Sequence, residues 1–270
     1  MTQATAQFLS RSAGHVSLWR TLVAQDLAAR YRGTLLGRAW PLLMPLLMLG
    51  VYGFVFGAVF RARWPGLAED DHLGFALNLF VGLLIHGLMA ESVGQAPSLM
   101  QRNSNFVRKM VFPLRVLVAV PLGSALFHTF LGLMLVLAIN GIWGSGLYAS
   151  LLAVPLILVP YMALLYGLAL AFAGLGVYLR DLSQLVSVLL VLVLFTSAVF
   201  FPRSMVPPVL SRAVGYNPIT WPVEAMRDAL LHGRWPAADG LGMYALAALV
   251  VLVLGWMTFG ALRRGFADVL

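Results

Sequence analysis

Residues 116–179 read VLVAVPLGSALFHTFLGLMLVLAINGIWGSGLYASLLAVPLILVPYMALLYGLALAFAGLGVYL, and no charged residue interrupts them. A helix crosses a membrane with about 20 apolar residues, so this run is too long for one crossing. The segment Asn140–Gly146, with the sequence NGIWGSG, breaks the run with turn-forming residues. The stretch therefore predicts two membrane-spanning helices joined by a tight turn.

Composition extends this prediction to the whole chain. Of the 270 residues, 61% are hydrophobic and only 10% are charged, with a mean hydropathy of +0.89. A soluble domain carries about a quarter charged residues, so the outer surface of this fold must be largely apolar, as only lipid tolerates. The chain has no cysteine, which excludes disulfides, a thiolate nucleophile and a cysteine-ligated metal site.

Charges and turn residues divide the chain into apolar segments. Arg38 and Arg61 bracket the first, and Glu91 ends the second. The fifth stops at Pro202, and the sixth lies between Asp239 and Arg263. We expect an all-α integral membrane protein, with a single domain over residues 1–270 and six transmembrane helices at 39–60, 73–90, 116–139, 151–177, 184–201 and 241–262.

The basic residues predict the orientation. The net charge of +8 comes from short segments between apolar spans, which favours a role in membrane orientation over nucleic-acid binding. With the N-terminus in the cytoplasm, twelve basic residues lie inside: Arg11, Arg20, Arg30, Arg32, Arg38, Arg102, Arg108, Lys109, Arg115, Arg180, Arg263 and Arg264. Six lie outside, among an equal number of acids: Arg61, Arg63, Arg203, Arg212, Arg227 and Arg234. Both termini are therefore expected in the cytoplasm.

Residues 17–32 predict an interfacial helix whose amphipathic character is imperfect. Leu18, Trp19 and Leu22 share one apolar arc, but Asp26 and Arg30 fall inside it at an i, i+4 spacing. A helix floating among lipid headgroups keeps such charges on its polar side. The pair indicates either a protein neighbour or an ion pair that satisfies itself.

Two further segments between spans predict structure. Between the second and third spans, Asn103 or Ser104 can cap a short helix that Pro113 ends. In the outer segment 202–239, Asn217 and Pro218 can begin a helix and Gly233 can end it. We expect short outer helices that dip back into the outer leaflet, because non-helical backbone at that depth needs shielding by protein or water.

Signs of catalysis are mostly lacking in the sequence. No G-x-x-x-x-G-K-[ST] pattern occurs, since the single lysine, Lys109, precedes a methionine, and no H-E-x-x-H occurs. His86 and His128 lie within predicted spans, where an ionisable group is either functional or a neutral histidine bonded across helices. Glu91 is the only carboxylate near a span interior, which gives little support to proton or sodium coupling.

Aromatic residues suggest a path for a sugar polymer. Tyr52, Phe56 and Phe60 repeat at i, i+4 and i+8 along one helix face, and Phe195 and Trp221 follow later in the chain. Flat apolar rings pack on the C–H faces of sugars and leave the hydroxyl groups to water. Ordinary helix packing and an interfacial aromatic belt are the alternative reading.

Several segments together resemble the polysaccharide-exporting ABC-2 permeases. They are the run DLAARYRGTLLGRAW (Asp26–Trp40) with Pro45 and YGFVF (Tyr52–Phe56), NFVRKMVFP (Asn105–Pro113), YLRDL (Tyr178–Leu182), and NPIT (Asn217–Thr220) leading into EAMRD (Glu224–Asp228). The similarity is spread over most of the chain in the right order, which makes it specific as a set.

This resemblance implies a homodimer with two copies of a separate cytoplasmic ABC ATPase, in a bacterial inner membrane. ATP and Mg would bind that ATPase, with no cofactor in this chain. The cargo would be a lipid-linked glycan, O-antigen first, with capsular polysaccharide or teichoic acid as alternatives. Contact with the ATPase is expected from the segments 103–112 and 178–182 and from the interfacial helix, through Asn103, Phe106, Arg108, Lys109, Tyr178, Arg180, Asp181, Asp26 and Arg30.

Two other functions stay open on the sequence. The same skeleton serves an ABC-2 exporter of a drug, haem or lipid, in which only the lining of the path differs. A membrane enzyme needs convergent polar residues at the surface, and the dense cluster is Asp70, Asp71 and His72. That cluster also fits a solvated loop tip.

Overall fold

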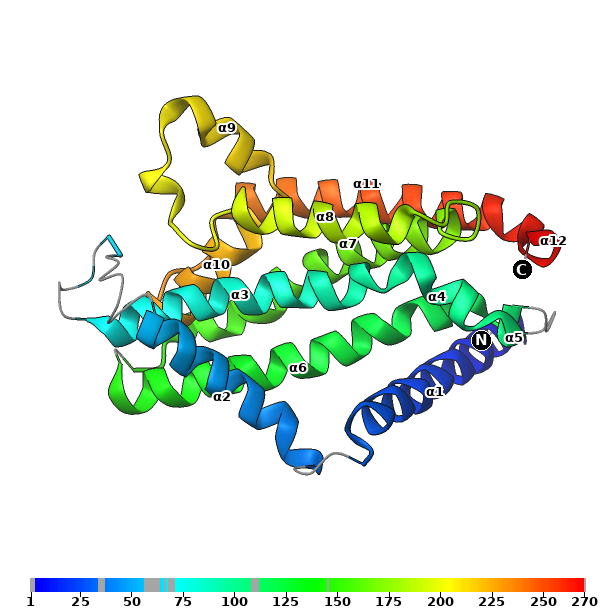
Figure 1. Ribbon diagram of the computed structural model, residues 1–270, viewed down its shortest axis with the longest axis horizontal. Helices are drawn as coiled ribbons and strands as arrows, with labels where there is room; N and C mark the ends of the chain where they lie inside the picture. The colour runs from blue at the N-terminus through cyan, green and yellow to red at the C-terminus, as the bar shows by residue number, and fades with distance from the viewer. Residues whose placement is uncertain are drawn as a thin grey trace.

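The computed structural model describes residues 3–33, 37–55, 64–65, 67, 71–107, 112–144 and 146–269 (Figure 1). In these ranges every regular element is a helix, which confirms the all-α prediction for the part of the chain described. Gly33, Gly146 and Gly233 stand at breaks between helices with φ of 77°, 95° and 69°, a conformation that glycine adopts without strain. Gly233 thus ends its helix as predicted.

Four segments of the described chain are long and apolar enough to cross a membrane. They overlap the predicted second, third, fourth and sixth spans. They are α3 (His72–Gly94) with α4 (Ala96–Arg102), α6 (Leu114–Trp143), η3 (Ala149–Ala153) with α7 (Val154–Leu175), and α11 (Ala238–Leu262) with η5 (Arg263–Gly265).

The helices in the predicted first and fifth spans are shorter. α2 (Trp40–Tyr52) has 13 residues and α8 (Leu182–Phe195) has 14, so each extends for about 20 Å, less than the roughly 30 Å of hydrocarbon. Residues 56–60 of the predicted first span lie outside the described ranges. α8 stops six residues before the predicted end at Phe201, because Asn217 Nδ2 donates to the carbonyl of Val193 and to Thr196 Oγ1 where the helix ends. Six crossings remain a prediction.

Other helix limits differ from the predicted ones for local reasons. α1 (Gln3–Tyr31) begins well before residue 17. α3 does not end at Glu91, where the second predicted span stops. It continues through this residue, because side chains on other helices bind the Glu91 carboxylate. α6 continues through Asn140, whose Nδ2 donates to the carbonyl of Gly146 at 2.7 Å and so places the turn after Trp143. Asp71 accepts from the backbone N–H of Gly74 and caps α3, which gives this member of the acidic cluster a structural role.

α3 lies at the centre of the bundle and packs against α6, α7, α8 and α10 (Thr220–Leu231) (Figure 1). Leu79, Val81 and Ile85 on α3 are fully buried. α7 and α11 cross closely at two glycines, since a methyl group added to Gly255 would collide with the carbonyl of Gly167. This crossing is the small-residue contact by which helices associate in lipid.

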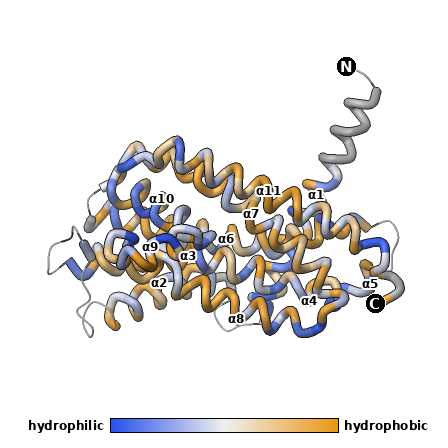
Figure 2. The backbone as a smooth tube through the Cα atoms, turned by 90° about the horizontal axis from the view of Figure 1, so that it is seen from above, coloured by the Kyte–Doolittle hydropathy of each residue, from blue (hydrophilic) through white to orange (hydrophobic). Residues whose placement is uncertain are grey.

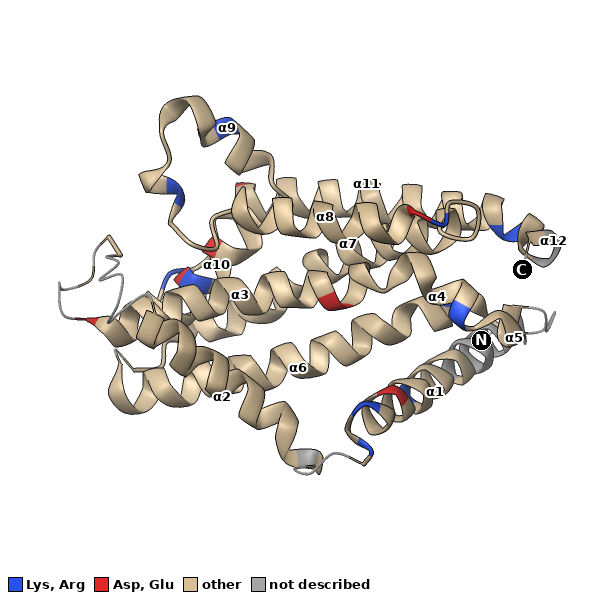
Figure 3. Ribbon diagram, viewed as in Figure 1, with Lys and Arg blue, Asp and Glu red and all other residues tan. Residues whose placement is uncertain are grey.

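The outward faces of the long helices remain apolar. Leu46 on α2, Val188 on α8 and Leu254 on α11 expose 48%, 57% and 58% of their surface. Figure 2 shows hydrophobic residues along α7, α8 and α11, and Figure 3 shows charges mostly near the helix ends. Such a surface belongs in lipid, as the composition predicts.

The two ends of the bundle carry different elements. Figure 1 places the N- and C-terminal parts, α5 (Ser104–Val107), and the turn between α7 and α8 at one end, here called the inner end after the predicted orientation. α9 (Pro208–Tyr216), α10 and the turn between α6 and η3 lie at the opposite, outer end. The chain therefore gathers the two predicted ATPase-contact segments on one side.

Candidate functional site

The inner end begins where α4 gives way to α5. Asn103 ends α4, with its Nδ2 donating to the Leu99 carbonyl at 2.9 Å, while its own carbonyl accepts from the backbone N–H of Phe106. α5 thus starts at Ser104, next to the predicted cap, while the Asn103 side chain bonds α4 rather than capping α5. The Phe106 ring is half-buried against Phe112, with centroids 4.8 Å apart. Arg108 and Lys109, the predicted contacts to acidic groups, lie outside the described residues.

The second predicted contact segment lies beside the first. Gln101 Nε2 on α4 donates to the carbonyl of Gly176 at 2.7 Å, which ties α4 to the end of α7. Tyr178 donates to the carbonyl of Leu262 at 2.9 Å, and Arg180 and Asp181 are exposed. The inner end therefore carries both α5 and the turn at 178–181, and we call these two segments the coupling surface after the role predicted for them.

Asp26 and Arg30 belong to a polar network inside the chain. Arg30 Nε lies 3.1 Å from Asp26 and its Nη1 bonds the Glu91 carboxylate on α3. Asp26 also accepts from Ser124 Oγ on α6 at 2.6 Å, and Glu91 is bonded to His128 Nδ1 at 2.9 Å. The structure shows both features expected of the Asp26–Arg30 pair. The two side chains form an ion pair with each other, and each also bonds a neighbouring helix of the same chain.

Tyr31 completes the network from the end of α1. Its hydroxyl lies 2.7 Å from His128 Nε2. Burial, and then the negative charge of Glu91, raise the pKa of the Tyr31 phenol. Tyr31 therefore keeps its proton, and the His128 ring lies between the Tyr31 hydroxyl at Nε2 and the Glu91 carboxylate at Nδ1. His128 was expected to be either a functional group or a histidine bonded across helices, and the structure shows the bond across helices.

α1 is docked on α6 rather than only lying among lipid headgroups. Trp19 Nε1 donates to the carbonyl of Ala119 at 2.9 Å. A methyl group at Gly123 would lie 2.7 Å from the side chains of Trp19 and Val23, so only glycine allows this close approach. The apolar arc of the amphipathic helix thus faces protein, with Asp26 and Arg30 on the same side.

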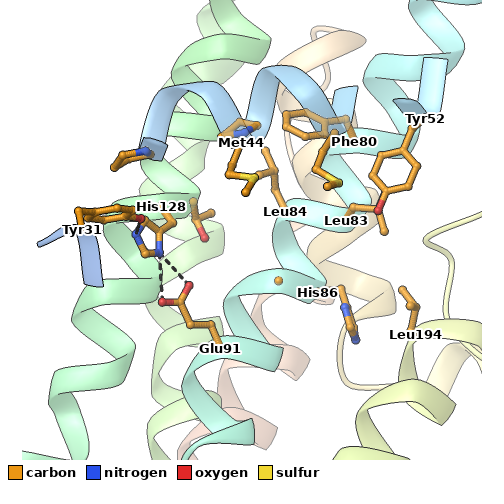
Figure 4. A pocket seen from close by; sticks show the side chains of 15 residues that line it. Tyr31, Met44, Tyr52, Phe80, Leu83, Leu84, His86, Glu91, His128 and Leu194 are labelled. Carbon is orange, nitrogen blue, oxygen red and sulfur yellow. Dashed lines mark hydrogen bonds and ion pairs between the residues drawn. The ribbon is translucent and has the colours of Figure 1, made fainter. Parts of the chain in front are cut away.

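A cavity of about 520 Å³ lies beside the network (Figure 4). Figure 4 shows His128 between Tyr31 and Glu91, with Met44, Leu84 and Phe80 forming apolar walls. His86 lies farther along, near Leu194, and bonds the Leu190 carbonyl at 3.1 Å. The cavity is mostly apolar, with one polar end formed by the network.

The predicted path residues do not form a single stripe in the described chain. Tyr52 lines the cavity, and Phe195 is 63% exposed and stacks on Phe200 at 5.3 Å. Trp221 stacks on Tyr244 at 4.8 Å, against α11 instead. Tyr52 and Phe200 pack on one cluster with Trp64 and Phe75, so the structure brings part of the set together. Phe56 and Phe60 lie outside the described residues.

Arg227, which the charge count places among the outer basic residues, is buried in the structure. It is 3% exposed, and its guanidinium donates to the carbonyls of Asn78, Ala198 and Val199 at 2.7, 2.5 and 2.6 Å. It also lies over the Trp64 ring at 4.5 Å. Burial lowers the pKa of Arg227, and nearby Glu224 partly offsets this effect. Arg227 thus ties α10 to α3 and to the turn after α8.

A sequence signal for this burial exists. Val223 and Leu230, four residues before and three after Arg227, lie on the same face of α10 and are buried. The arginine therefore occupies the apolar face of the helix. A count of charges per segment ignores that placement.

Comparison with known proteins identifies the family. The family model of the ABC-2 type transporter matches residues 17–231, well over half of the chain. The chain belongs to the ABC-2 type transporter family. The match includes the coupling surface, the polar network and Arg227, and it ends where α10 ends.

Named relatives of this ABC-2 protein align over nearly its whole length. It is 28% identical over 250 residues to the O-antigen export system permease protein RfbA of Myxococcus xanthus, covering 92% of this chain and 93% of that protein. The corresponding RfbA protein of Klebsiella pneumoniae is 24% identical over 250 residues, covering 91% and 92%. The polysialic acid transport protein KpsM of Escherichia coli is 22% identical over 242 residues, covering 87% and 89%.

The described part of the ABC-2 protein holds no group of three or more His, Cys, Asp or Glu side chains placed to bind a metal ion. Its notable polar features are therefore the coupling surface, the network at Glu91 and the buried Arg227.

Proposed function

We propose that this chain is the membrane subunit of an ABC exporter that moves a lipid-linked polysaccharide outward across a bacterial inner membrane. The observation that carries the proposal is the alignment of O-antigen export permeases over more than nine-tenths of both chains. The apolar helix surfaces and the family membership agree with such a subunit. The segments that resemble ATPase-contacting elements also share the inner end.

O-antigen is the preferred cargo, because the relatives with that name are more similar than the capsule relative. The similarity to KpsM supports capsular polysaccharide as the second candidate. Teichoic acid, or an ABC-2 cargo such as a drug or lipid, is a further alternative that the same helical frame could carry.

ATP hydrolysis belongs to a separate subunit in this proposal. The chain has no phosphate-cradling loop, so ATP and Mg bind the partner and this chain needs no cofactor of its own. Two copies of the ATPase contact a homodimer of this chain. Phe106, Arg108, Lys109, Arg180 and Asp181 make direct contact at the coupling surface, with Asn103 and Tyr178 shaping it. Asp26 and Arg30, which face their own chain, act on that contact indirectly.

The membrane arrangement has six spans, with α2 and α8 as the first and fifth and both termini in the cytoplasm. α9 and α10 act as short outer gate helices. Phe195, Tyr52, Phe56, Phe60 and Trp221 line parts of the glycan path near the subunit interface. Phe195 suits this role because more than half of its ring surface faces outward from the isolated subunit.

Deletion of the gene in the bacterium that makes this chain tests the proposal. The expected result is loss of the surface glycan and accumulation of lipid-linked polymer in the cytoplasm. Plasmid-borne wild-type chain restores export, measured by lipopolysaccharide gels and by surface antibody labelling of O-antigen and of capsule. Unchanged amounts of both surface glycans in the deletion strain would refute polysaccharide export.

A further inference from the structure

Glu91 lies where α1, α3 and α6 meet. Its carboxylate bonds Arg30 on α1 and, at 2.9 and 3.1 Å, His128 on α6, while its own helix is α3. The side chains of Arg30, Glu91 and His128 expose 28%, 21% and 23% of their surface. Charges so shielded interact more strongly than charges in water. The contact holds α1 and α6 to α3 at one point.

α3 connects this point to the coupling surface. Only Gln95 separates α3 from α4, and its Nε2 donates to the Glu91 carbonyl at 3.1 Å, while Ser98 Oγ donates to the Gln95 carbonyl. α4 then leads into α5 across Asn103. A displacement of α5 therefore reaches Glu91 through a nearly continuous helix.

The cavity gives the contact room to rearrange. Glu91, His128 and Tyr31 form its polar end, so one side of the network faces about 520 Å³ of space rather than packed side chains. Close-packed interiors resist such movement. α1 keeps a separate hold on α6 through Trp19 and Asp26, which lets α1 follow a neighbouring helix without detaching.

We propose that Glu91 is a positioning residue of the transport cycle. Together with Arg30 and His128 it forms a tie, here called the Glu91 tie, that makes α1 and α6 move with α3 when the ATPase displaces α5. This inference rests on the proposed function and assigns a role to a residue that the coupling surface does not contain. ATP hydrolysis without the tie would proceed, but it would move the spans less.

Glu91→Ala tests the tie in proteoliposomes that hold the chain with its ATPase. ATP hydrolysis is expected to stay within about twofold of wild type, while glycan exported per ATP falls by about tenfold, in the range of typical coupling between sites. Arg20→Ala is the matched control, because Arg20 is an exposed charge on the same α1. A purely structural role would instead lower complex yield, ATP hydrolysis and export together.

A cross-link can replace the tie, since the chain has no cysteine of its own. In the variant Arg30→Cys with Glu91→Cys, a short thiol-cleavable methanethiosulfonate linker is expected to restore most of the export per ATP. Dithiothreitol should abolish it again. Lack of restoration, with the linker present in the purified protein, would overturn the proposal.

A readout without cargo separates this inference from the proposed function. Spin labels at Arg20→Cys and Ser104→Cys report the distance between α1 and α5. On ATP binding, this distance is expected to stay constant in the labelled protein that retains Glu91. In the labelled Glu91→Ala variant it is expected to change. If wild type exports no glycan, the proposed function fails while this distance still tests the tie. If both proteins show the same change, the tie is refuted.

Discussion

A buried guanidinium in this protein is held chiefly by backbone carbonyl groups. The three carbonyls that face Arg227 come from α3 and from the turn after α8. Two of them, the Ala198 and Val199 carbonyls, lie past the end of α8, where carbonyl groups lack intrahelical partners and carry partial negative charge that stabilises a cation. Glu91, in contrast, has two cationic or donor side chains around it. Both residues show that a charge inside the apolar bundle connects helices.

Replacing Arg227 with glutamine removes donors from buried carbonyls. Unpaired buried polar groups cost about 1–3 kcal/mol each, so Arg227→Gln is expected to destabilise the protein by about 3 kcal/mol. Thermal unfolding in detergent should then occur roughly 6–12 °C lower. Arg212→Gln on exposed α9 serves as the control, with an unchanged midpoint. Equal midpoints for both variants would contradict the structural role of Arg227.

At the scale of helices, packing between two long helices and contact with a partner subunit require different residues. α7 and α11 pack through glycines because lipid gives no hydrophobic driving force and backbone approach must supply the attraction. α5 is short and gains its order from Asn103 and from the ring contact of Phe106 with Phe112. It is therefore suited to a contact that a partner subunit completes.

Gly255→Ala tests the crossing of α7 and α11. The added methyl group collides with the Gly167 carbonyl, so stability is expected to fall by about 2 kcal/mol. Gly242→Ala on the same helix meets open space and should be neutral or stabilise by up to about 1 kcal/mol. The midpoints of thermal unfolding of the two purified variants, compared with wild type, measure both expected changes in stability. An unfolding midpoint of Gly255→Ala equal to that of wild type would mean that α7 and α11 are not in close contact.

The combined change Phe106→Ala and Arg108→Ala tests the coupling surface. Export and substrate-stimulated ATP hydrolysis are both expected to fall about tenfold or more, because the contact that passes force between subunits is lost. The assay measures both rates on the purified complex. Exposed Arg20 again offers the matched control, as Arg20→Ala. Unchanged export and stimulation would place the ATPase contact elsewhere.

At the scale of the whole molecule, the two ends of the bundle differ in what they offer. The inner end collects the chain termini, α5 and the exposed turn at Arg180, whereas the outer end carries α9 and α10 (Figure 1). Lipid-facing apolar side chains lie between them. This polarity suits a subunit that receives force on one face and releases cargo on the other.

Single cysteines in this cysteine-free chain test the orientation. Arg212→Cys on α9 is expected to react with a membrane-impermeant maleimide in spheroplasts, because the proposed topology places α9 on the outer side. Arg264→Cys near the C-terminus should react only after lysis. Both residues are exposed, so accessibility within the subunit does not limit labelling. The reverse pattern would invert the proposed topology.

Much of the helical frame and part of the site were predictable from the sequence. The all-helical class followed from long apolar runs, and the break at Asn140–Gly146 followed from its glycines. The pair Asp26 and Arg30 was noticeable as charges on an apolar arc. Their partners Glu91, Ser124 and His128 were not, because no local spacing specifies which helices will lie side by side.

The sequence by itself determined that this chain places its apolar surface in lipid, forms helices and lacks a phosphate-binding loop, since hydropathy, helical period and local motifs are properties of neighbouring residues. Only the tertiary structure decided that α1 docks on α6, that Glu91 joins three helices and that Arg227 is buried. These facts depend on contacts between residues far apart in the chain, such as Asn78 and Arg227, which are separated by 149 in sequence number. Packing in three dimensions selects such contacts.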